Sequence, residues 1–216
     1  VALRAKEHGV KQFVFMSTAK VFGESTTNKP AWNEFSECNP MDAYGKSKYE
    51  AERLILGLQD ENFKVAIVRS PLVYGVGVKA NMYNLIKLVD KISVLPLGKI
   101  QNRRSMVYVG NLVALLHHII TNQSSGIFIA GDSQPLSTTE LTISIKGALR
   151  KKRLIISIPK FIRKPIQSIK PGIFERLFGS LELDNSLTNK RLNFEPPFSI
   201  EQGIQEMVEW YLKNKR

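Results

Sequence analysis

Residues 12–18 read QFVFMST, an apolar run that ends in two hydroxyl-bearing residues. Two further runs, KVAIVR at 64–69 and GIFIA at 126–130, are also almost continuously apolar. Such runs are typical of parallel strands that are buried on both faces of a sheet. Helical patterns near 41–58 and 111–121 separate them. This alternation predicts an α/β fold with part of a doubly wound parallel sheet.

The rest of the chain adds mainly helices. Residues 1–8 look like the tail of a helix that ends at Gly9. Ser137 and Glu140 form a capping box, which predicts a helix start. Three more elements are expected: a helix near 81–91, a strand at 105–109 and an amphipathic helix from Ser199 to Arg216.

Residues 42–52, DAYGKSKYEAE, place Tyr44 and Lys48 four positions apart and so on one face of a helix. An ammonium group close to a phenol favours the phenolate, which is the form that accepts a proton. Thr18 would supply a second hydroxyl to the same substrate oxygen. A Tyr and a Lys at this spacing are more commonly an exposed helix face, so the pair needs support from its surroundings. With that support, the pattern indicates redox chemistry at an alcohol or a carbonyl.

Five blocks in order supply the support: GVKQFVFMSTAKVFGE, NPMDAYGKSKYEAE, VAIVRSPLVYGVGVKAN, LPLGKIQNRRSMVYVGNLV and FIAGDSQPLSTTEL. Together they resemble the extended short-chain dehydrogenase/reductase family, and within it the nucleotide-sugar epimerases, reductases and dehydratases. The resemblance implies that Thr18, Tyr44 and Lys48 are catalytic. It implies that Lys48 also holds the nicotinamide ribose of NAD, with NADP left open, and that Ser17, Tyr44 and Pro71 contact the cofactor as well.

The family's glycine-rich dinucleotide turn, G-x-x-G-x-x-G or similar, does not occur in this sequence. The nearest candidate, Gly75-Val76-Gly77, follows a later strand and reads better as a turn toward the substrate. We expect the chain to be the back portion of a longer protein and to bind the cofactor poorly alone. Residues 1–75 would be the C-terminal part of the NAD-binding domain. Residues 76–216 would form a mainly helical substrate lobe, with 105–130 returning to the sheet.

The resemblance also implies which residues bind a nucleotide diphosphate. Arg104 matches a phosphate-binding arginine, and a guanidinium suits phosphate oxygens. Asn81 matches a side-chain amide at a helix start, and the backbone at Leu95 matches a stretch that contacts the base. Epimerases of the family commonly supply a second arginine to the diphosphate, and Arg176 is the residue available for that role here. One departure is Leu72, where many members carry an asparagine.

Thr18 is followed by Ala19 and Lys20, where sugar 4,6-dehydratases of this family carry an acidic pair. Neither residue can act as the acid and base that removal of water requires at neutral pH. Two reactions remain open. One is C4 epimerisation of a UDP-sugar by transient oxidation, and the other is reduction of a UDP-4-keto-6-deoxy-amino sugar for polysaccharide synthesis.

The net charge of +12 exceeds what one UDP diphosphate requires. Between Lys146 and Arg176 the chain has ten Lys or Arg against one acid, interleaved with Ile and Phe. This stretch is either a membrane-surface contact or a solvated face over ordinary core residues. A non-catalytic RNA-binding relative is a further alternative, against which the retained Thr18, Tyr44 and Lys48 count.

The remaining expectations concern partners and location. Cys38 is the single cysteine, which excludes an internal disulfide framework and fits the cytoplasm. No spacing of His, Cys, Asp or Glu suggests a metal site. The resemblance implies a UDP-sugar substrate and a homodimer that uses the helix carrying Tyr44.

Overall fold

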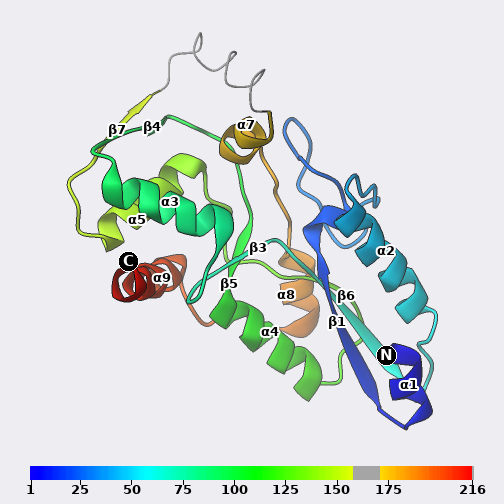
Figure 1. The fold of residues 1–216 in the computed structure, drawn as a ribbon. Coiled ribbons are helices and arrows are strands. Elements are labelled where there is room, and N and C mark those ends of the chain that lie inside the picture. The colour runs from blue at the N-terminus through cyan, green and yellow to red at the C-terminus, as the bar shows by residue number, and fades with distance from the viewer. Residues whose placement is uncertain (158–170, 216) are drawn as a thin grey trace.

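A three-stranded parallel sheet lies at the centre of one half of the computed structural model, which describes residues 1–157 and 171–215. Its order is β1-β2-β6 (Figure 1). The strands are β1 (Gln12–Thr18), β2 (Lys64–Ser70) and β6 (Gly126–Ile129). The register aligns Thr18 with Ser70, so β1 and β2 end at the same edge of the sheet.

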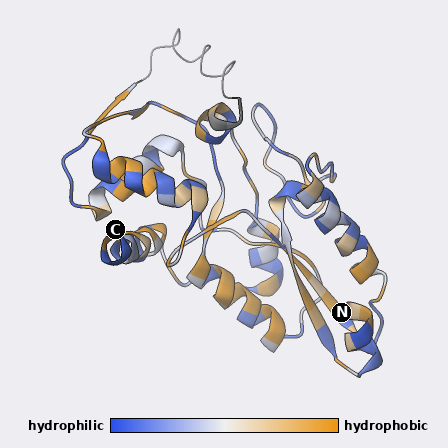
Figure 2. Ribbon diagram, in the orientation of Figure 1, coloured by the Kyte–Doolittle hydropathy of each residue, from blue (hydrophilic) through white to orange (hydrophobic). Residues whose placement is uncertain are grey.

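Helices cover both faces of this sheet, as the apolar strands require. On one face, Val65 and Ile67 cluster with residues of α1 (Ala2–Glu7) and α2 (Ala43–Leu56). On the other face, Val68 clusters with residues of α4 (Val109–Thr121). Figure 2 shows the hydrophobic colour along the strands between these layers. The predicted partial doubly wound sheet is confirmed.

A second, mainly helical lobe packs around its own core. Its helices are α3 (Ala80–Lys91), α5 (Thr138–Ala148) and α9 (Ile200–Asn214), which lie together at the left of Figure 1. Ile86, Ile145 and Met207 are fully buried where they meet. The Ser137–Glu140 capping box opens α5 as expected.

Several short elements have no counterpart in the sequence-based prediction. Strand β3 (Leu72–Tyr74) was not expected, and it pairs with β5 (Met106–Tyr108), which is the strand expected at 105–109. Strands β4 (Val94–Gly98) and β7 (Leu154–Ser157) were not expected either, and they pair with each other. Three short helices complete the list: η1 (Ala19–Val21), α7 (Pro171–Phe178) and α8 (Ser186–Leu192). Within 105–130, β5 therefore joins β3, and β6 joins the main sheet.

Over the part of the chain that the structure describes, no helix combines the length and apolarity needed to cross a membrane. The basic stretch from Lys146 to Arg176 lies partly outside the described residues, so both interpretations of it, a membrane-surface contact and a solvated face, stay predictions.

Candidate active site

The residues predicted to be catalytic meet at the carboxyl end of β1. Ser17 and Thr18 are its last two residues. Ser17 is buried, and its Oγ has no hydrogen-bond partner among the residues described. Thr18 is half-buried and accepts a hydrogen bond at Oγ1 from the backbone N–H of Lys20 at 3.3 Å.

Helix α2 brings the other two predicted residues to this strand end. Tyr44 lies in its first turn with 53% of its surface exposed. Lys48, one turn later, donates a hydrogen bond from Nζ to the carbonyl oxygen of Met16 at 3.0 Å. The same Nζ lies 4.7 Å from the ring centroid of Phe15 and 5.9 Å from that of Tyr44. The predicted set is therefore assembled by one helix and one strand.

A buried ion pair fixes α2 against the sheet one turn beyond Lys48. Arg69, at the end of β2, donates from Nε and Nη2 to the carboxylate of Glu52, with a shortest distance of 2.7 Å. The side chains are only 4% and 1% exposed, and the guanidinium also lies 4.7 Å from the ring of Phe22. Tyr44, Lys48 and Glu52 follow at intervals of four, so the pair sets which face of α2 meets β1.

Sequence reasoning missed the role of Glu52. Two signals were available: its spacing of four from Lys48, and the charged Arg69 at the end of an otherwise apolar strand. A charge at such a position needs a partner once it is buried.

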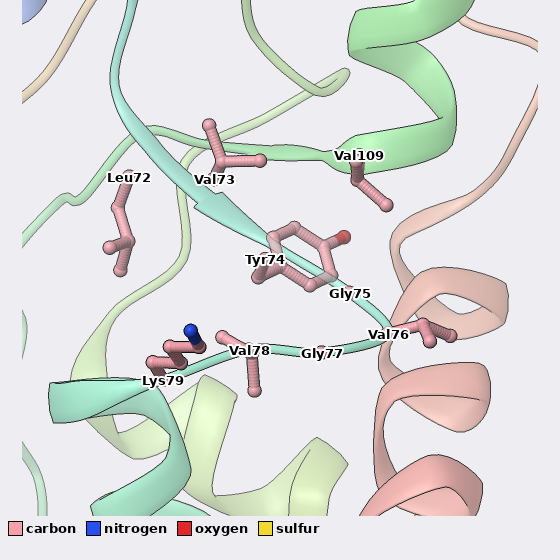
Figure 3. Close-up of a pocket in the computed structure, with 9 residues that line it drawn as sticks. All are labelled: Leu72, Val73, Tyr74, Gly75, Val76, Gly77, Val78, Lys79 and Val109. Atoms are coloured by element: carbon pink, nitrogen blue, oxygen red, sulfur yellow. The ribbon is translucent and has the colours of Figure 1, made fainter.

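The segment after β2 forms a shallow hollow of about 240 Å³ beside this strand end. Residues 72–79 and Val109 line it (Figure 3). Leu72 and Val73 are exposed there, while Pro71 before them is buried. Lys79 supplies the one charged side chain among the lining residues. This side of the site is therefore largely apolar, in keeping with the leucine at position 72.

Tyr74 anchors the hollow to the core. Its hydroxyl donates to Asp132 Oδ2 at 2.7 Å, and Asp132 Oδ1 accepts from the backbone N–H of Tyr108 and from Asn111 Nδ2. Burial raises the pKa of Tyr74, and the neighbouring Asp132 carboxylate raises it further. Tyr74 is therefore a structural donor here.

Three of the four residues predicted to bind substrate gather around α7. Arg176, on α7, donates from Nη1 to Asn81 Oδ1 at the start of α3, at 3.3 Å. Arg104 donates from Nη1 to the carbonyl oxygens of Gly179 at 3.1 Å and Glu175 at 3.4 Å. Burial lowers the pKa of Arg104, against the raising effect of nearby Glu175. In this arrangement Arg104 holds the C-terminal end of α7 and Arg176 is the exposed cation.

Leu95 lies apart from that group. Its side chain is fully buried in β4, and its backbone pairs with Ile155 of β7. A role for its backbone in contacting a base stays a prediction. Within the described ranges, no group of three or more His, Cys, Asp or Glu is placed to hold a metal ion.

Comparison with known proteins assigns the chain to a family. Residues 1–131 match the NAD dependent epimerase/dehydratase family. A UDP-glucose 4-epimerase of Vibrio cholerae is 35% identical over 99% of this chain and 67% of its own length. An N-acetyl-alpha-D-glucosaminyl-diphospho-ditrans,octacis-undecaprenol 4-epimerase of Escherichia coli is 28% identical over 71% of this chain and 47% of its own length. The chain thus spans about two thirds or less of the length of these relatives.

Solved structures agree on the fold. The UDP-glucose 4-epimerase of Thermotoga maritima, crystallised with UDP-glucose, superposes with a TM-score of 0.73 at 22% identity, over 100% of this chain and 68% of that one. The dTDP-glucose 4,6-dehydratase of Bacillus anthracis, solved with NAD, gives 0.74 at 19% identity, over 99% of this chain and 66% of that one. The chain belongs to the NAD dependent epimerase/dehydratase family.

Proposed function

We propose that the protein is an NAD-dependent 4-epimerase of a UDP-sugar. The observation that carries the proposal is the contact of the Lys48 ammonium with Met16 beside Tyr44, at the strand end that presents Thr18. The 35% identity to a UDP-glucose 4-epimerase supports the same reaction.

The residues at this strand end fit the nicotinamide-ribose part of NAD. Ser17 Oγ is buried and free of hydrogen-bond partners within the described residues, and the Lys48 ammonium lies at the same strand end. A ribose and a carboxamide offer the oxygens that such donors need. When bound, NAD would supply the hydride acceptor for transient oxidation at C4 and return the hydride. No glycine-rich pyrophosphate turn is present in this sequence, so the fit concerns only the nicotinamide end.

The chain's own residues would move the proton. Tyr44 would take the proton from the sugar hydroxyl at C4 and give it back on reduction. Thr18 would hydrogen-bond the same oxygen and hold it near the phenol. The positive charge of Lys48 would favour the phenolate form of Tyr44, which is the form that accepts the proton from the C4 hydroxyl.

Lys20 argues against dehydration, although several relatives are dehydratases. One is the dTDP-D-glucose 4,6-dehydratase of mouse, at 26% identity. The Lys20 ammonium forms ion pairs with Asp42 and with Glu24. The hydrogen bond to Asp42 is the main cause of a raised pKa of Lys20, so the group stays charged and cannot serve as a base.

A C4 reductase is the runner-up, since it would need the same three residues. A dTDP-4-dehydro-6-deoxyglucose reductase of Escherichia coli is 24% identical over 94% of this chain. The apolar hollow at the exposed Leu72 favours this alternative, because a 6-deoxy sugar carries a methyl group.

The test uses the complete product of the gene with NAD and a panel of UDP-glucose, UDP-N-acetylglucosamine and a UDP-4-keto-6-deoxy-amino sugar. We expect C4 epimers of one of the first two. Tyr44→Phe should lower turnover by about 100-fold or more with UDP-sugar binding retained, since general acid–base groups contribute about 10²- to 10⁴-fold. Tyr49→Phe is the matched control, because Tyr49 lies on the same helix but is partly buried and packs against the core.

Near-parental turnover of Tyr44→Phe would overturn the catalytic assignment. Consumption of NADH or NADPH with the keto sugar alone would replace the epimerase by the reductase. The homodimer stays a prediction, which sedimentation of the same preparation would check.

A further inference from the structure

Helix α2 starts in direct contact with the turn that follows β1, which is the short helix η1. Gly45, in the first turn of α2, is buried. A Cβ atom at this position would lie 2.8 Å from the carbonyl oxygen of Lys20 and 3.2 Å from its carbonyl carbon. Both of these atoms belong to the backbone, which cannot rotate away as a flexible side chain can. A third neighbour is the side-chain oxygen Oδ1 of Asp42, at 3.1 Å. The approach of α2 to this turn therefore requires glycine at position 45.

Two side chains also form an ion pair between the start of α2 and the turn after β1. Asp42 is the N-cap of α2, and its Oδ1 accepts from the backbone N–H of Gly45 at 2.6 Å. Its other oxygen, Oδ2, pairs with the Lys20 ammonium. The backbone N–H of Lys20 in turn bonds to Thr18 Oγ1.

These contacts lie beside both of the groups that the proposed reaction needs. Gly45 follows Tyr44 directly, and Asp42 precedes it by two residues. Lys20 follows Thr18 by two residues and bonds to its hydroxyl. A change in the separation between the start of α2 and the turn after β1 would therefore move the backbone of Tyr44 relative to Thr18. Lys48 is held separately, by Met16.

We propose that Gly45 and the Lys20–Asp42 ion pair are positioning elements that set the distance between Thr18 and Tyr44. The inference rests on the proposed function for its catalytic consequence. The residues concerned do not touch the reacting atoms, and they act through the placement of α2 on β1.

Gly45→Ala is the first test, with Gly57→Ala as its matched control. Gly57 caps the other end of α2, where a Cβ atom meets its nearest neighbours at an ordinary 3.6 Å. In the complete gene product, Gly45→Ala should lower kcat by about 10- to 100-fold, because small misplacements of reacting groups have effects of that size. KM for the UDP-sugar and the affinity for NAD should stay near the parental values, and Gly57→Ala should match the parent throughout. Parental kcat in Gly45→Ala would overturn the proposal.

The ion pair is tested with changes that separate charge from capping. Asp42→Asn keeps an oxygen for the N–H of Gly45 but removes the charge that pairs with Lys20. Glu24→Gln is the control, because Glu24 pairs with Lys20 without touching α2. We expect kcat to fall in Asp42→Asn and in Lys20→Met, with no further fall in the double variant, and to be parental in Glu24→Gln. Additive losses in the double variant would overturn the role of the pair.

A structural readout keeps this inference separate from the proposed reaction. Crystal structures of the parent and of Gly45→Ala give the distance from Thr18 Oγ1 to Tyr44 Oη directly, whether or not a UDP-sugar is turned over. A longer distance in Gly45→Ala, with Gly57→Ala unchanged, supports the positioning role. An unchanged distance overturns it. Failure of the parent to turn over any UDP-sugar would overturn the proposed function alone.

Discussion

Lys48 and Met16 join the middle of α2 to β1, through a hydrogen bond of 3.0 Å from the ammonium to the backbone carbonyl. Met16 lies two residues before Thr18, and Lys48 lies four residues after Tyr44. One ammonium therefore connects the strand and the helix that carry the proposed catalytic hydroxyls.

Replacing Lys48 by Met should remove this connection together with the positive charge near Tyr44. We expect turnover of the UDP-sugar to fall by about 100-fold or more, since the phenolate would lose its stabilising charge. Binding of NAD, measured by calorimetry, should weaken as well if the ammonium holds the ribose. Lys46→Met is the control, because Lys46 lies exposed on the same helix. Unchanged turnover in Lys48→Met would contradict its role.

The buried pair of Arg69 and Glu52 leads to a stability prediction. Glu52→Leu leaves the guanidinium of Arg69 buried without its partner, which costs about 3–5 kcal/mol of unfolding free energy in comparable pairs. The double change Glu52→Leu with Arg69→Met should recover much of that loss, because it buries no unpaired charge. Urea unfolding measures the free energy of unfolding of the single and the double variant.

An exposed pair provides the comparison. Arg103 binds Glu182 with 60% of its side chain in solvent, so Arg103→Met should cost less than about 1 kcal/mol. If Glu52→Leu cost no more than this, the buried pair would not be what fixes α2 on the sheet.

Arg176 is expected to contribute charge to the binding of UDP. It donates to the neutral amide of Asn81 and is exposed, so its charge is available to a diphosphate. Arg176→Met should weaken UDP binding by about 10- to 100-fold, in line with hydrogen bonds to charged groups of about 1.5–3 kcal/mol. Calorimetry with UDP measures the change. Arg103→Met serves again as the control, and equal effects of the two changes would argue for general charge rather than a specific contact.

The sequence predicted the parts of the fold that have long, regular patterns. The apolar runs at 12–18 and 64–69 are β1 and β2, because a strand covered on both faces needs apolar residues throughout. Strands β3 and β4 were not predicted. They have three and five residues, and β4 contains Pro96 and Gly98, so their pairing depends on distant segments rather than on local pattern.

In the candidate site too, some residues could be predicted from the sequence and some contacts could not. Tyr44 and Lys48 were predicted from their spacing and Thr18 from its position at the end of an apolar run, with a catalytic role implied by the family resemblance. The structure places all three at one strand end. The partner of Glu52 lies 17 residues away on another element, which a local pattern does not reveal. Arg104 was predicted as a phosphate ligand, and that role stays a prediction. Its contacts with the end of α7 arise from packing between segments more than 70 residues apart.

Asp90 links the lobe helices and leads to a prediction about pH. Its carboxylate pairs with the Lys151 ammonium and accepts from Lys215 Nζ at 3.0 Å and from the Tyr211 hydroxyl at 3.1 Å. Burial raises the pKa of Asp90, but the hydrogen bonds from the two lysines and the tyrosine outweigh it and lower the pKa to about 2.

The pKa of Asp90 is therefore below the value of about 3.9 expected in the unfolded chain. Above about pH 4 the carboxylate is charged in both states, and its contacts stabilise the folded state in full. As the pH falls from about 4 to about 2, the unfolded state binds the proton first, and that stabilisation is lost. The loss should be on the order of 2 kcal/mol, with allowance for the screening of two partly exposed lysines.

Urea unfolding across this pH range compares the parent with Asp90→Asn. The Asn variant should be less stable near neutral pH and should lose less stability on acidification, because it has no carboxylate to protonate. Glu61→Gln, which changes an exposed carboxylate, should follow the parent. If Asp90→Asn and the parent lost stability in parallel as the pH fell, the lysine and tyrosine contacts would not depend on the charge of Asp90. The join between α3 and α9 would then rest on apolar packing around Ile86 and Met207 alone.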